Sequence, residues 1–513
     1  MIDTAALREK VLDLAIRGKL VPQDPNDEPA SVLLERIRAQ KLQMVKEGKL
    51  KAKDIKDDTI IFKGDGNCHY EKFADGTIKN VQEEIPFELP DSWCWCRLGA
   101  IFAHNTGKAL KTSNTQGNKL TYITTSNLYW DRFELDSLKE MYFTEAEVEK
   151  YSATKGDLLV CEGGDIGRAA IWSFDYDIRL QNHIHKLRRF YHIETRFYYY
   201  IFNYYKTIGK INGNGIGLQG LSSNVLHNLI VPLPPLSEQQ KIVSNVDSCF
   251  VLIDAIDTNK ELIEKDIADI KSKILELAIQ GKLVEQDEND EPASVLLERI
   301  RAEKKAKLGK KYVESYIYKG DDNCYYEKVG SKTQEISDKI TFNLPERWCW
   351  ITLKEIATIT SGKTPKPEQL SSMGTVPYFK VGDMNLSGNE LFMNKAYSYV
   401  NEHYDGIMFP ENSIIFPKNG GALLTNKKRI LSTTSLVDLN TGVLIPSKLV
   451  NSEYMYYLFS TVDFSKNYKG STIPTIDNDI IGNHIFGLPP IQEQLRIVKK
   501  IKLLIQIIEK SLI

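Results

Sequence analysis

The sequence predicts an α+β protein in which two mixed α/β domains are joined by long antiparallel coiled-coil helices, in a pseudo-two-fold and circular arrangement. Three observations predict this fold. The chain of 513 residues is too long for one ordinary core, one sequence plan occurs twice along it, and a long heptad pattern of apolar residues lies between the copies. Each copy would therefore contribute one domain and part of the helical region.

The duplication is clearest at residues 18–39, which read GKLVPQDPNDEPASVLLERIRA, and at residues 281–302, which read GKLVEQDENDEPASVLLERIRA. These segments differ only where Glu285 and Glu288 replace Pro22 and Pro25. Shorter matches follow in the same order and pair 62–68 with 318–324, 89–95 with 344–350, and 233–239 with 488–494. These matched segments form a nearly constant frame that is repeated in both halves.

Between the last two matches the halves diverge strongly, so each frame carries a variable domain. A duplicated scaffold whose domains have simply drifted apart would give this pattern. The functional interpretation, which we favour, is that the two frames meet two identical partners while the two variable domains meet two different ones.

A heptad pattern begins after Pro235, where apolar residues recur at alternating steps of four and three. The predicted seam contains Ile242, Val246, Ile253, Ile267, Ile274 and Leu277. The same spacing occurs near the C-terminus at Ile497, Ile501, Leu504 and Ile508, and near the N-terminus at Leu7, Val11 and Leu14. When the two copies are aligned, the C-terminal segment matches the front of the central helix and the N-terminal segment matches its back. We expect an antiparallel bundle with the chain ends close together; a plain oligomerisation coil is the alternative.

The repeats divide the chain into five parts. They are an N-terminal helical region (1–55) that pairs with the C-terminus, a first variable domain (56–235), a central helical spacer (236–310), a second variable domain (311–490) and a C-terminal helix (491–513). Within the variable domains, strands are expected at 158–161, 169–172, 183–187, 413–416 and 442–445, and helices at 197–205 and 453–460.

Loops of the variable domains combine small, amide and basic side chains, which hold phosphates and read base edges in DNA. The candidates are Lys108, Lys111, Thr112, Asn114 and Arg168 in the first domain, and Ser361, Lys363, Thr364, Lys418, Asn419, Lys427, Arg429 and Lys469 in the second. Each loop alone is a common solvated loop, but their matching places in two divergent domains favour DNA contact. Because the net charge is −2, we expect base contacts with modest phosphate contact. The seam would extend about 54 Å, enough to hold two domains about one DNA turn, roughly 35 Å, apart.

The sequence contains no convincing catalytic centre or metal site. Residues 215–220 match a dinucleotide-binding pattern but follow a helix, and His183 and His185 are too few to hold a metal. Seven cysteines without metal-type spacing, and no apolar run long enough for a membrane span, indicate a cytoplasmic protein with reduced thiols. We expect no catalysis, metal or cofactor in this chain. A nuclease or methyltransferase with an unrecognised centre, and a coiled-coil scaffold that does not bind DNA, are the alternatives.

Several repeated motifs occur in a specific order. They are Ala15-Ile16 with Gly18-Lys19-Leu20-Val21, Leu89-Pro90-x-x-Trp93 and Pro234-Pro235-Leu236-x-Glu238-Gln239, with second copies at 278–284, 344–348 and 489–494. This combination spans essentially the whole chain and resembles the specificity (S) subunit of type I restriction–modification systems.

The resemblance implies two target-recognition domains that each read one half of a bipartite double-stranded DNA site across a non-specific gap. It also implies that the helices dock two methyltransferase (M) subunits, which methylate adenine using S-adenosylmethionine. Two restriction (R) subunits would add translocation and cleavage that require ATP and magnesium. No base-contacting residue is carried over, because the family has no fixed reading motif, and the segment 41–84 has no implied role.

Overall fold

The computed structural model describes residues 2–52, 55, 58–110, 115–211, 221–401, 404, 406–466, 468–470 and 473–511. The chain divides into an N-terminal unit of residues 2–261 and a C-terminal unit of residues 262–513. The frames of both units contain the same succession of helices and strands, so the duplication of the frame sequence is also a duplication of structure. In the part of the chain that the structure describes, no helix is long and apolar enough to cross a membrane.

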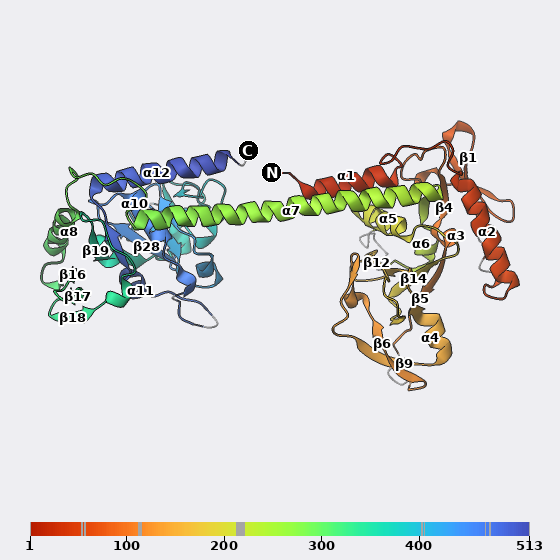
Figure 1. The fold of residues 1–513 in the computed structure, drawn as a ribbon, viewed down its shortest axis with the longest axis horizontal. Helices are drawn as coiled ribbons and strands as arrows, with labels where there is room; N and C mark the ends of the chain where they lie inside the picture. The colour runs from red at the N-terminus through yellow and green to blue at the C-terminus, as the bar shows by residue number, and fades with distance from the viewer. Residues whose placement is uncertain are drawn as a thin grey trace. The chain divides into compact units, whose positions relative to one another are not determined.

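In the N-terminal unit, α1 (Thr4–Ile16) lies along the first half of α7 (Leu236–Ile279) (Figure 1). Thr4 Oγ1 donates a hydrogen bond to Asp257 at 2.7 Å, and the Arg8 guanidinium pairs with Asp254. Residue numbers therefore rise along α1 as they fall along α7. The prediction that the N-terminal helix packs antiparallel to the central helix is confirmed.

In the C-terminal unit, α12 (Ile491–Lys510) packs against the second half of α7. Lys271 of α7 pairs with Glu509 near the end of α12 at 3.5 Å, whereas Gln286, just after α7, donates to Glu493 near the start of α12 at 2.6 Å. These two helices are therefore also antiparallel, as predicted for the C-terminal helix.

The predicted seam residues differ in burial along the helices. Ile242, Val246, Ile253, Ile274, Ile497 and Ile501 are buried, while Val11, Leu14, Ile267, Leu277, Leu504 and Ile508 are half-buried and Leu7 is exposed. Towards the middle of α7, Leu262, Ile263 and Ile270 are exposed. The apolar pattern is thus covered near the two ends of α7 and open in between.

The frame of each unit contains a two-stranded sheet, three helices and a small three-stranded sheet. The elements of the N-terminal unit are α2 (Ala30–Lys46), β1 (Ile60–Lys63), β2 (His69–Lys72), β3 (Ile78–Asn80), β4 (Cys94–Arg97), α3 (Leu98–Ile101), α6 (Ser223–His227) and β15 (Ile230–Leu233). Their counterparts in the C-terminal unit are α8 (Ala293–Leu308), β16 (Ser315–Lys319), β17 (Tyr325–Val329), β18 (Lys332–Glu335), β19 (Cys349–Thr352), α9 (Leu353–Ile356), α11 (Asn478–Gly482) and β29 (Ile485–Leu488). Within the segment 41–84, the described residues include the end of α2 and the small sheet β1-β2-β3.

The first variable domain contains two four-stranded sheets with the orders β12-β11-β14-β5 and β10-β13-β6-β9. Its elements are β5 (Phe102–Thr106), β6 (Asn118–Ile123), β7 (Leu128–Tyr129), β8 (Arg132–Phe133), β9 (Lys139–Phe143), α4 (Glu145–Tyr151), β10 (Ser152–Ala153), β11 (Leu158–Cys161), β12 (Ala169–Ile171), β13 (Ile178–Leu180), β14 (Ile184–Arg189) and α5 (Thr195–Thr207). The strands and the helix predicted for this domain are confirmed as β11, β12, β14 and α5.

The second variable domain contains sheets with the orders β20-β28-β25-β26-β23 and β21-β24-β22-β27. Its elements are β20 (Ala357–Ser361), β21 (Leu370–Ser371), β22 (Val376–Phe379), β23 (Phe392–Met393), β24 (Ser398–Val400), β25 (Ile414–Pro417), β26 (Arg429–Leu431), β27 (Leu436–Val437), β28 (Thr441–Pro446) and α10 (Ser452–Ser460). The predicted strands and helix correspond to β25, β28 and α10. Both domains pair equivalent strands, since β13 lies parallel to β6 and β27 lies parallel to β22.

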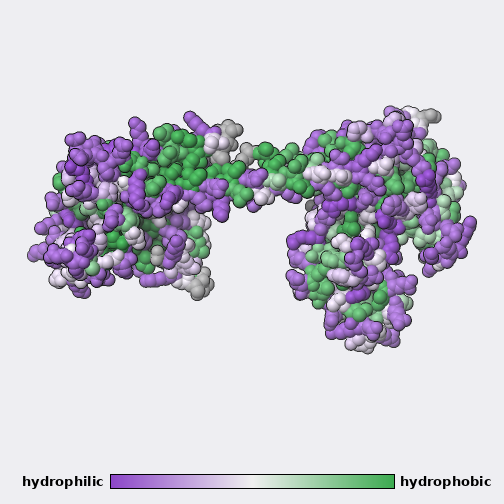
Figure 2. All heavy atoms as spheres, in the orientation of Figure 1, coloured by the Kyte–Doolittle hydropathy of each residue, from purple (hydrophilic) through white to green (hydrophobic). Residues whose placement is uncertain are grey.

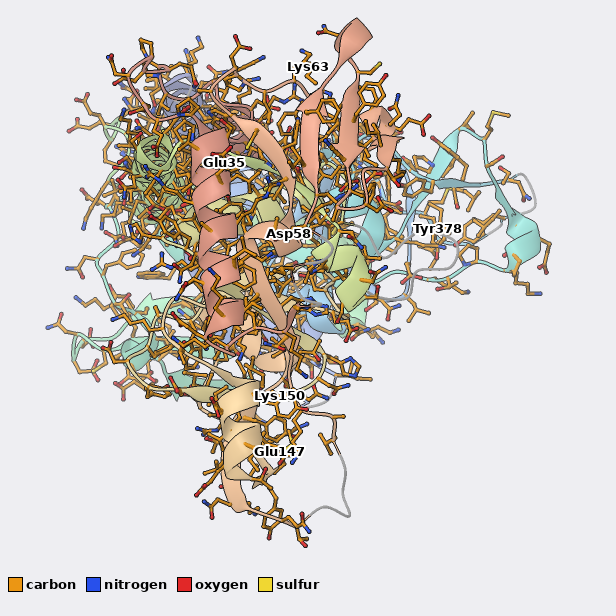
Figure 3. The ribbon with its side chains drawn as sticks, turned by 90° about the vertical axis from the view of Figure 1, so that its right-hand side faces the viewer. Glu35, Asp58, Lys63, Glu147, Lys150 and Tyr378 are labelled. Atoms are coloured by element: carbon orange, nitrogen blue, oxygen red, sulfur yellow. The ribbon has the colours of Figure 1, made fainter. Side chains whose placement is uncertain are left out.

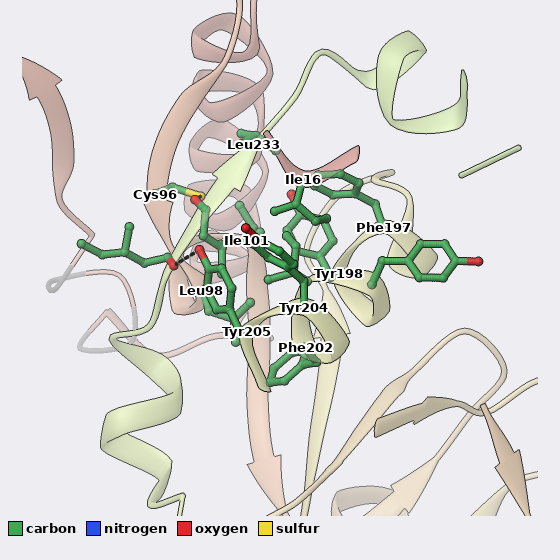
Figure 4. Close-up of a cluster of buried hydrophobic side chains, with 14 of the residues drawn as sticks. Ile16, Cys96, Leu98, Ile101, Phe197, Tyr198, Phe202, Tyr204, Tyr205 and Leu233 are labelled. Atoms are coloured by element: carbon green, nitrogen blue, oxygen red, sulfur yellow. Dashed lines mark hydrogen bonds between the residues drawn. The ribbon is translucent and has the colours of Figure 1, made fainter. Parts of the chain in front are cut away.

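The core of the N-terminal unit is built around the tyrosine-rich helix α5 (Figure 4). Tyr198 and Tyr205 are fully buried there, together with Phe197 and Phe202. Tyr205 donates its hydroxyl to the carbonyl oxygen of Ile230 in the frame strand β15 at 3.0 Å. The aromatic helix therefore fastens the variable domain to its frame through one continuous core.

Candidate DNA interface

Three repeated motifs meet in one hydrogen-bonded cluster in each unit, which we call the frame knot. In the N-terminal unit, Glu238 accepts hydrogen bonds from Trp93 Nε1 at 2.9 Å and from Gln23 Nε2 at 2.5 Å. In the C-terminal unit, Glu493 accepts from Trp348 Nε1 at 2.8 Å and from Gln286 Nε2 at 2.6 Å. Both carboxylates are almost fully buried, and burial raises the pKa of each above its ordinary value.

The neighbouring glutamine joins each frame to its variable domain. Gln239 Nε2 donates to the carbonyl oxygen of Pro234 at 2.8 Å, and its Oε1 accepts from the amide of Glu194, the residue before α5, at 2.9 Å. Gln494 makes the same bonds with Pro489 and with Asn451, the residue before α10. The repeated motifs thus hold the architecture together and position the variable domains.

Two glycines of the repeated motifs are required by the same packing. Gly18 and Gly281 adopt φ values of +66° and +70°, and a Cβ atom on either would lie 2.5 or 2.4 Å from Pro90 or Pro345. Glycine tolerates both the positive φ and the close approach, which other residues do not. The first glycine of each repeat is therefore fixed by the frame rather than by a ligand.

The predicted Gly-Lys loops lie in equivalent places in the two variable domains. The amides of Lys108 and Lys363 donate to the carbonyl oxygens of Leu180 and Val437, each at 2.8 Å. Cβ atoms on the preceding glycines would lie 2.3 and 2.2 Å from the same passing backbone. The glycine of each loop is therefore explained by a close backbone crossing and needs no phosphate.

The two lysines of these loops have different surroundings. The Lys108 ammonium is buried and donates to Glu147 of α4 and to the Tyr142 carbonyl oxygen, both at 2.7 Å. Figure 3 shows Glu147 on α4. This ion pair gives Lys108 a structural role and weighs against the predicted DNA contact. Lys363 is exposed at the equivalent position and remains a candidate for a phosphate contact.

Of the other four candidates in the first domain, Arg168 is the one that lies within the described residues. Lys111, Thr112 and Asn114 lie outside the described residues. The Arg168 guanidinium donates to the Thr125 carbonyl oxygen at 2.6 Å and lies 5.0 Å from the centre of the Tyr129 ring. With 17% of its side chain exposed, Arg168 fastens two loops together more than it faces solvent.

In the second domain, several predicted residues come together around a concavity of about 750 Å³. Thr364 and Asn419 line it, and the Lys418 ammonium behind them donates to Ser361 Oγ at 2.7 Å. Lys469 is exposed on a strand bridge to Thr475, which also bridges to Asn419. The structure therefore gathers these five candidates from three separate loops.

Lys427 and Arg429 belong to a different part of the second domain. Lys427 donates to Asn385, while Arg429 donates to the carbonyl oxygens of Lys428 at 2.8 Å and Met384 at 3.4 Å. Neither residue is among the described residues that line the concavity. Both therefore brace the turn that contains Asn385 instead of joining the other candidates.

Four further residues, which were not predicted from the sequence, line the same concavity. Asp438 accepts hydrogen bonds from Thr364 Oγ1 at 2.9 Å and from the Tyr378 hydroxyl at 3.0 Å. Asn440 accepts from Asn419 Nδ2 at 3.2 Å, and the exposed Lys380 also faces this space. Lysine and amide groups beside a hydrogen-bonded floor can contact phosphates and base edges. The role of these residues depends on how separate loops fold together, so the local sequence does not indicate it.

His183 and His185 of the first domain have different surroundings. His183 is exposed and lies 3.2 Å from Glu162, whereas His185 is buried between His104 at 2.9 Å and the Leu221 carbonyl oxygen at 2.6 Å. Burial lowers the pKa of His185 and lowers that of His104 to about 3. Among the described residues, no three histidine, cysteine or acidic side chains are placed to share a metal.

Comparison with known proteins agrees with this architecture. The family model described as "Type I restriction modification DNA specificity domain" matches residues 90–265 and 345–513. The type I restriction enzyme EcoAI specificity subunit of Escherichia coli is 28% identical over 582 residues, covering 98% of this chain and 89% of the relative. The EcoEI specificity subunit of Escherichia coli is 27% identical over 421 residues, covering 70% of this chain and 63% of the relative.

A solved chain described under "complex assembly" and "conformational transition of the type I R-M system" has the same fold, with a TM-score of 0.55 and 17% identity over 83% of this chain and 93% of that one. The family match confirms the prediction of a recognition subunit rather than an enzyme. It gives no support to a stand-alone nuclease or methyltransferase, or to a scaffold that does not bind DNA. The chain therefore belongs to the family of type I restriction–modification DNA specificity subunits.

Proposed function

We propose that each variable domain reads one half of a bipartite double-stranded DNA target, and that the two frames dock two methyltransferase subunits. The observation that carries this proposal is the contrast between the two kinds of surface. Equivalent positions of the variable domains differ in what they expose, since Lys108 is buried in an ion pair and Lys363 is exposed, whereas the frames are nearly identical. Two domains that recognise different sequences need different surfaces, whereas two binding sites for the same partner need the same surface.

The surface that is repeated on α2 and α8 supports two binding sites for the same partner. Leu33, Leu34 and Ile37 of α2 are buried, so packing explains why they are repeated in α8. Packing does not explain the exposed residues that are also identical, which are Ser31, Glu35, Arg36 and Ala39 in α2 and Ser294, Glu298, Arg299 and Ala302 in α8. Figure 3 shows Glu35 on α2.

Exposed apolar residues on the long helices support docking of further helices. In the N-terminal unit, Val251 and Leu252 are 67% and 65% exposed on α7. In the C-terminal unit, Leu503 and Ile507 of α12 are 50% and 55% exposed, and Figure 2 shows apolar side chains gathered along α12. Patches of this kind on a chain are typical of protein interfaces.

The cofactors in this proposal belong to the partners. The methyltransferase subunits would bind S-adenosylmethionine for adenine methylation, and two restriction subunits joined through them would use ATP and magnesium. This chain would supply recognition and geometry alone, and the assembly would act on DNA in the cytoplasm.

Mass measurement of the assembled complex tests the two binding sites for methyltransferase subunits. The single variants Arg36→Glu and Arg299→Glu should each leave one methyltransferase subunit bound, and the double variant should leave none. Arg132→Glu, an exposed change in the first variable domain, serves as the control and should keep both. A complex that retains both methyltransferase subunits in the double variant would contradict docking on α2 and α8.

Domain exchange tests the reading role. Replacing residues 90–232 with the corresponding domain of the EcoEI specificity subunit should change one half of the methylated sequence and leave the other half unchanged. Methylated adenines would be mapped by sequencing DNA from cells that contain the whole system. A change in both halves would show that the two domains do not read independently.

A further inference from the structure

Two short turns occupy the same place in the two variable domains. Residues 181–183 join β13 to β14, and residues 438–440 join β27 to β28. The amides of Gln181 and Asp438 donate to the carbonyl oxygens of Ile123 and Phe379 at 3.0 and 2.9 Å. Each turn then closes on itself, because the amide three residues further on donates back to the first residue, again at 3.0 and 2.9 Å.

A second loop touches each turn in the same way. The amide of Glu162 donates to the His183 carbonyl oxygen at 2.9 Å, and the amide of Lys418 donates to the Asn440 carbonyl oxygen at 2.8 Å. The Gly-Lys crossing described above also borders both turns. The backbone of the two sites is therefore held by matching hydrogen bonds even though the surrounding sequences have diverged.

The side chains on this matching backbone differ at every position. Glu162, Gln181, Asn182 and His183 form the first reading cluster, and Lys418, Asp438, Leu439 and Asn440 form the second reading cluster. At the end of each turn the side chain is exposed and bonded to a side chain of the second loop, as His183 is to Glu162 and Asn440 is to Asn419. Packing does not determine the chemistry of these exposed side chains.

We propose that the first and second reading clusters contact base edges in the DNA grooves and determine the two half-site sequences; this inference rests on the proposed function. Amide side chains can bond adenine, acidic groups accept from cytosine, and an apolar side chain such as Leu439 can contact a thymine methyl group. A fixed backbone with exchangeable side chains is the arrangement that lets two domains of one fold read different sequences.

Within the second reading cluster, Asp438 acts as a positioning residue. Its carboxylate accepts from Thr364, from Tyr378, and from both the amide and the Nδ2 of Asn440, at 2.9 to 3.0 Å. These bonds fix Asn440 before any DNA arrives, so its amide group can discriminate between bases without first being ordered.

Exchange of the two clusters in the full chain, co-produced with its methyltransferase subunits, tests the proposal. The first set combines Glu162→Lys, Gln181→Asp, Asn182→Leu and His183→Asn. It should change the methylated sequence in one half-site and leave the other half-site unchanged. The reciprocal set of Lys418→Glu, Asp438→Gln, Leu439→Asn and Asn440→His should change only the other half-site.

Single variants keep the test decisive if the combined variants fold poorly. His183→Ala and Asn440→Ala should each weaken binding to the native target by about 5- to 150-fold while non-specific binding stays the same. Lys155→Ala, which removes an exposed ion pair with Asp175 in the first domain, is the control and should leave the target unchanged. Folded cluster variants that methylate the original sequence would overturn the inference. A parent chain that directs no sequence-specific methylation would instead overturn the proposed function.

Discussion

The frame knot provides a matched pair of substitutions in each unit. Trp93→Phe removes the indole N–H that bonds Glu238, and Trp95→Phe removes a buried indole N–H that has no hydrogen-bond partner among the described residues. The two tryptophans are 6% and 3% exposed, so the loss of ring packing is similar. The difference between the two variants therefore isolates the hydrogen bond to the buried carboxylate.

A hydrogen bond to a charged group contributes about 1.5–3 kcal/mol, and its loss leaves a buried oxygen without a donor. For a unit of this size, about 1 kcal/mol corresponds to 2–4 °C in Tm. Trp93→Phe should therefore unfold roughly 3–12 °C below Trp95→Phe in calorimetry, by the same reasoning. The C-terminal unit repeats the test with Trp348→Phe against Trp350→Phe, whose N–H is likewise unpaired within the described part of the chain. Equal unfolding temperatures within either pair would refute the reasoning.

Three further predictions follow from individual side chains. Gly362→Ala places a Cβ atom 2.2 Å from the Asp438 carbonyl oxygen and should destabilise the C-terminal unit by about 1–3 kcal/mol, and an unchanged denaturant midpoint would exclude this strain. Lys108→Met should destabilise the N-terminal unit by about 1–3 kcal/mol because Glu147 loses its donor. Lys363→Met should instead leave stability unchanged and lower the slope of the salt dependence of DNA binding by about 1. The reverse result in melting and binding titrations would contradict the assigned roles. Because the pKa of His104 falls from 6.5 to about 3 on folding, the N-terminal unit should lose stability as the pH drops below 6.5 towards 3. The variant His104→Gln should show a weaker loss, and identical pH profiles would exclude His104 as the cause.

The helices and the repeated frame could be predicted from the sequence because their signals are periodic or duplicated. The heptad spacing of Ile242 and Val246 requires only that a helix bury one face. The frame knot could not be derived in this way. Trp93 and Glu238 are separated by 145 residues, and nothing in either local sequence indicates that they share a hydrogen bond.

The interface was harder to predict because lysine, threonine and glycine occur in loops for several reasons. Lys108 and Lys363 both follow a glycine, yet Lys108 is ion-paired with Glu147 of α4 whereas Lys363 is exposed. Asp438 and Asn440 gave no signal by composition, since their role depends on the turn that brings Thr364 and Tyr378 to the same carboxylate. Prediction from residue type therefore pointed to loops, but it could not show which of their side chains are exposed and which are held in internal bonds.

The pairing of β4 with β15 places Trp95 opposite Pro232, and the pairing of β19 with β29 places Trp350 opposite Gly487. Each variable domain therefore leaves its frame and returns to it at adjacent points on one short ladder. Residues gained or lost inside a domain change its length, but the two points where it joins the frame stay next to each other. The size of a recognition domain can thus drift over evolutionary time without shifting the helices that carry it.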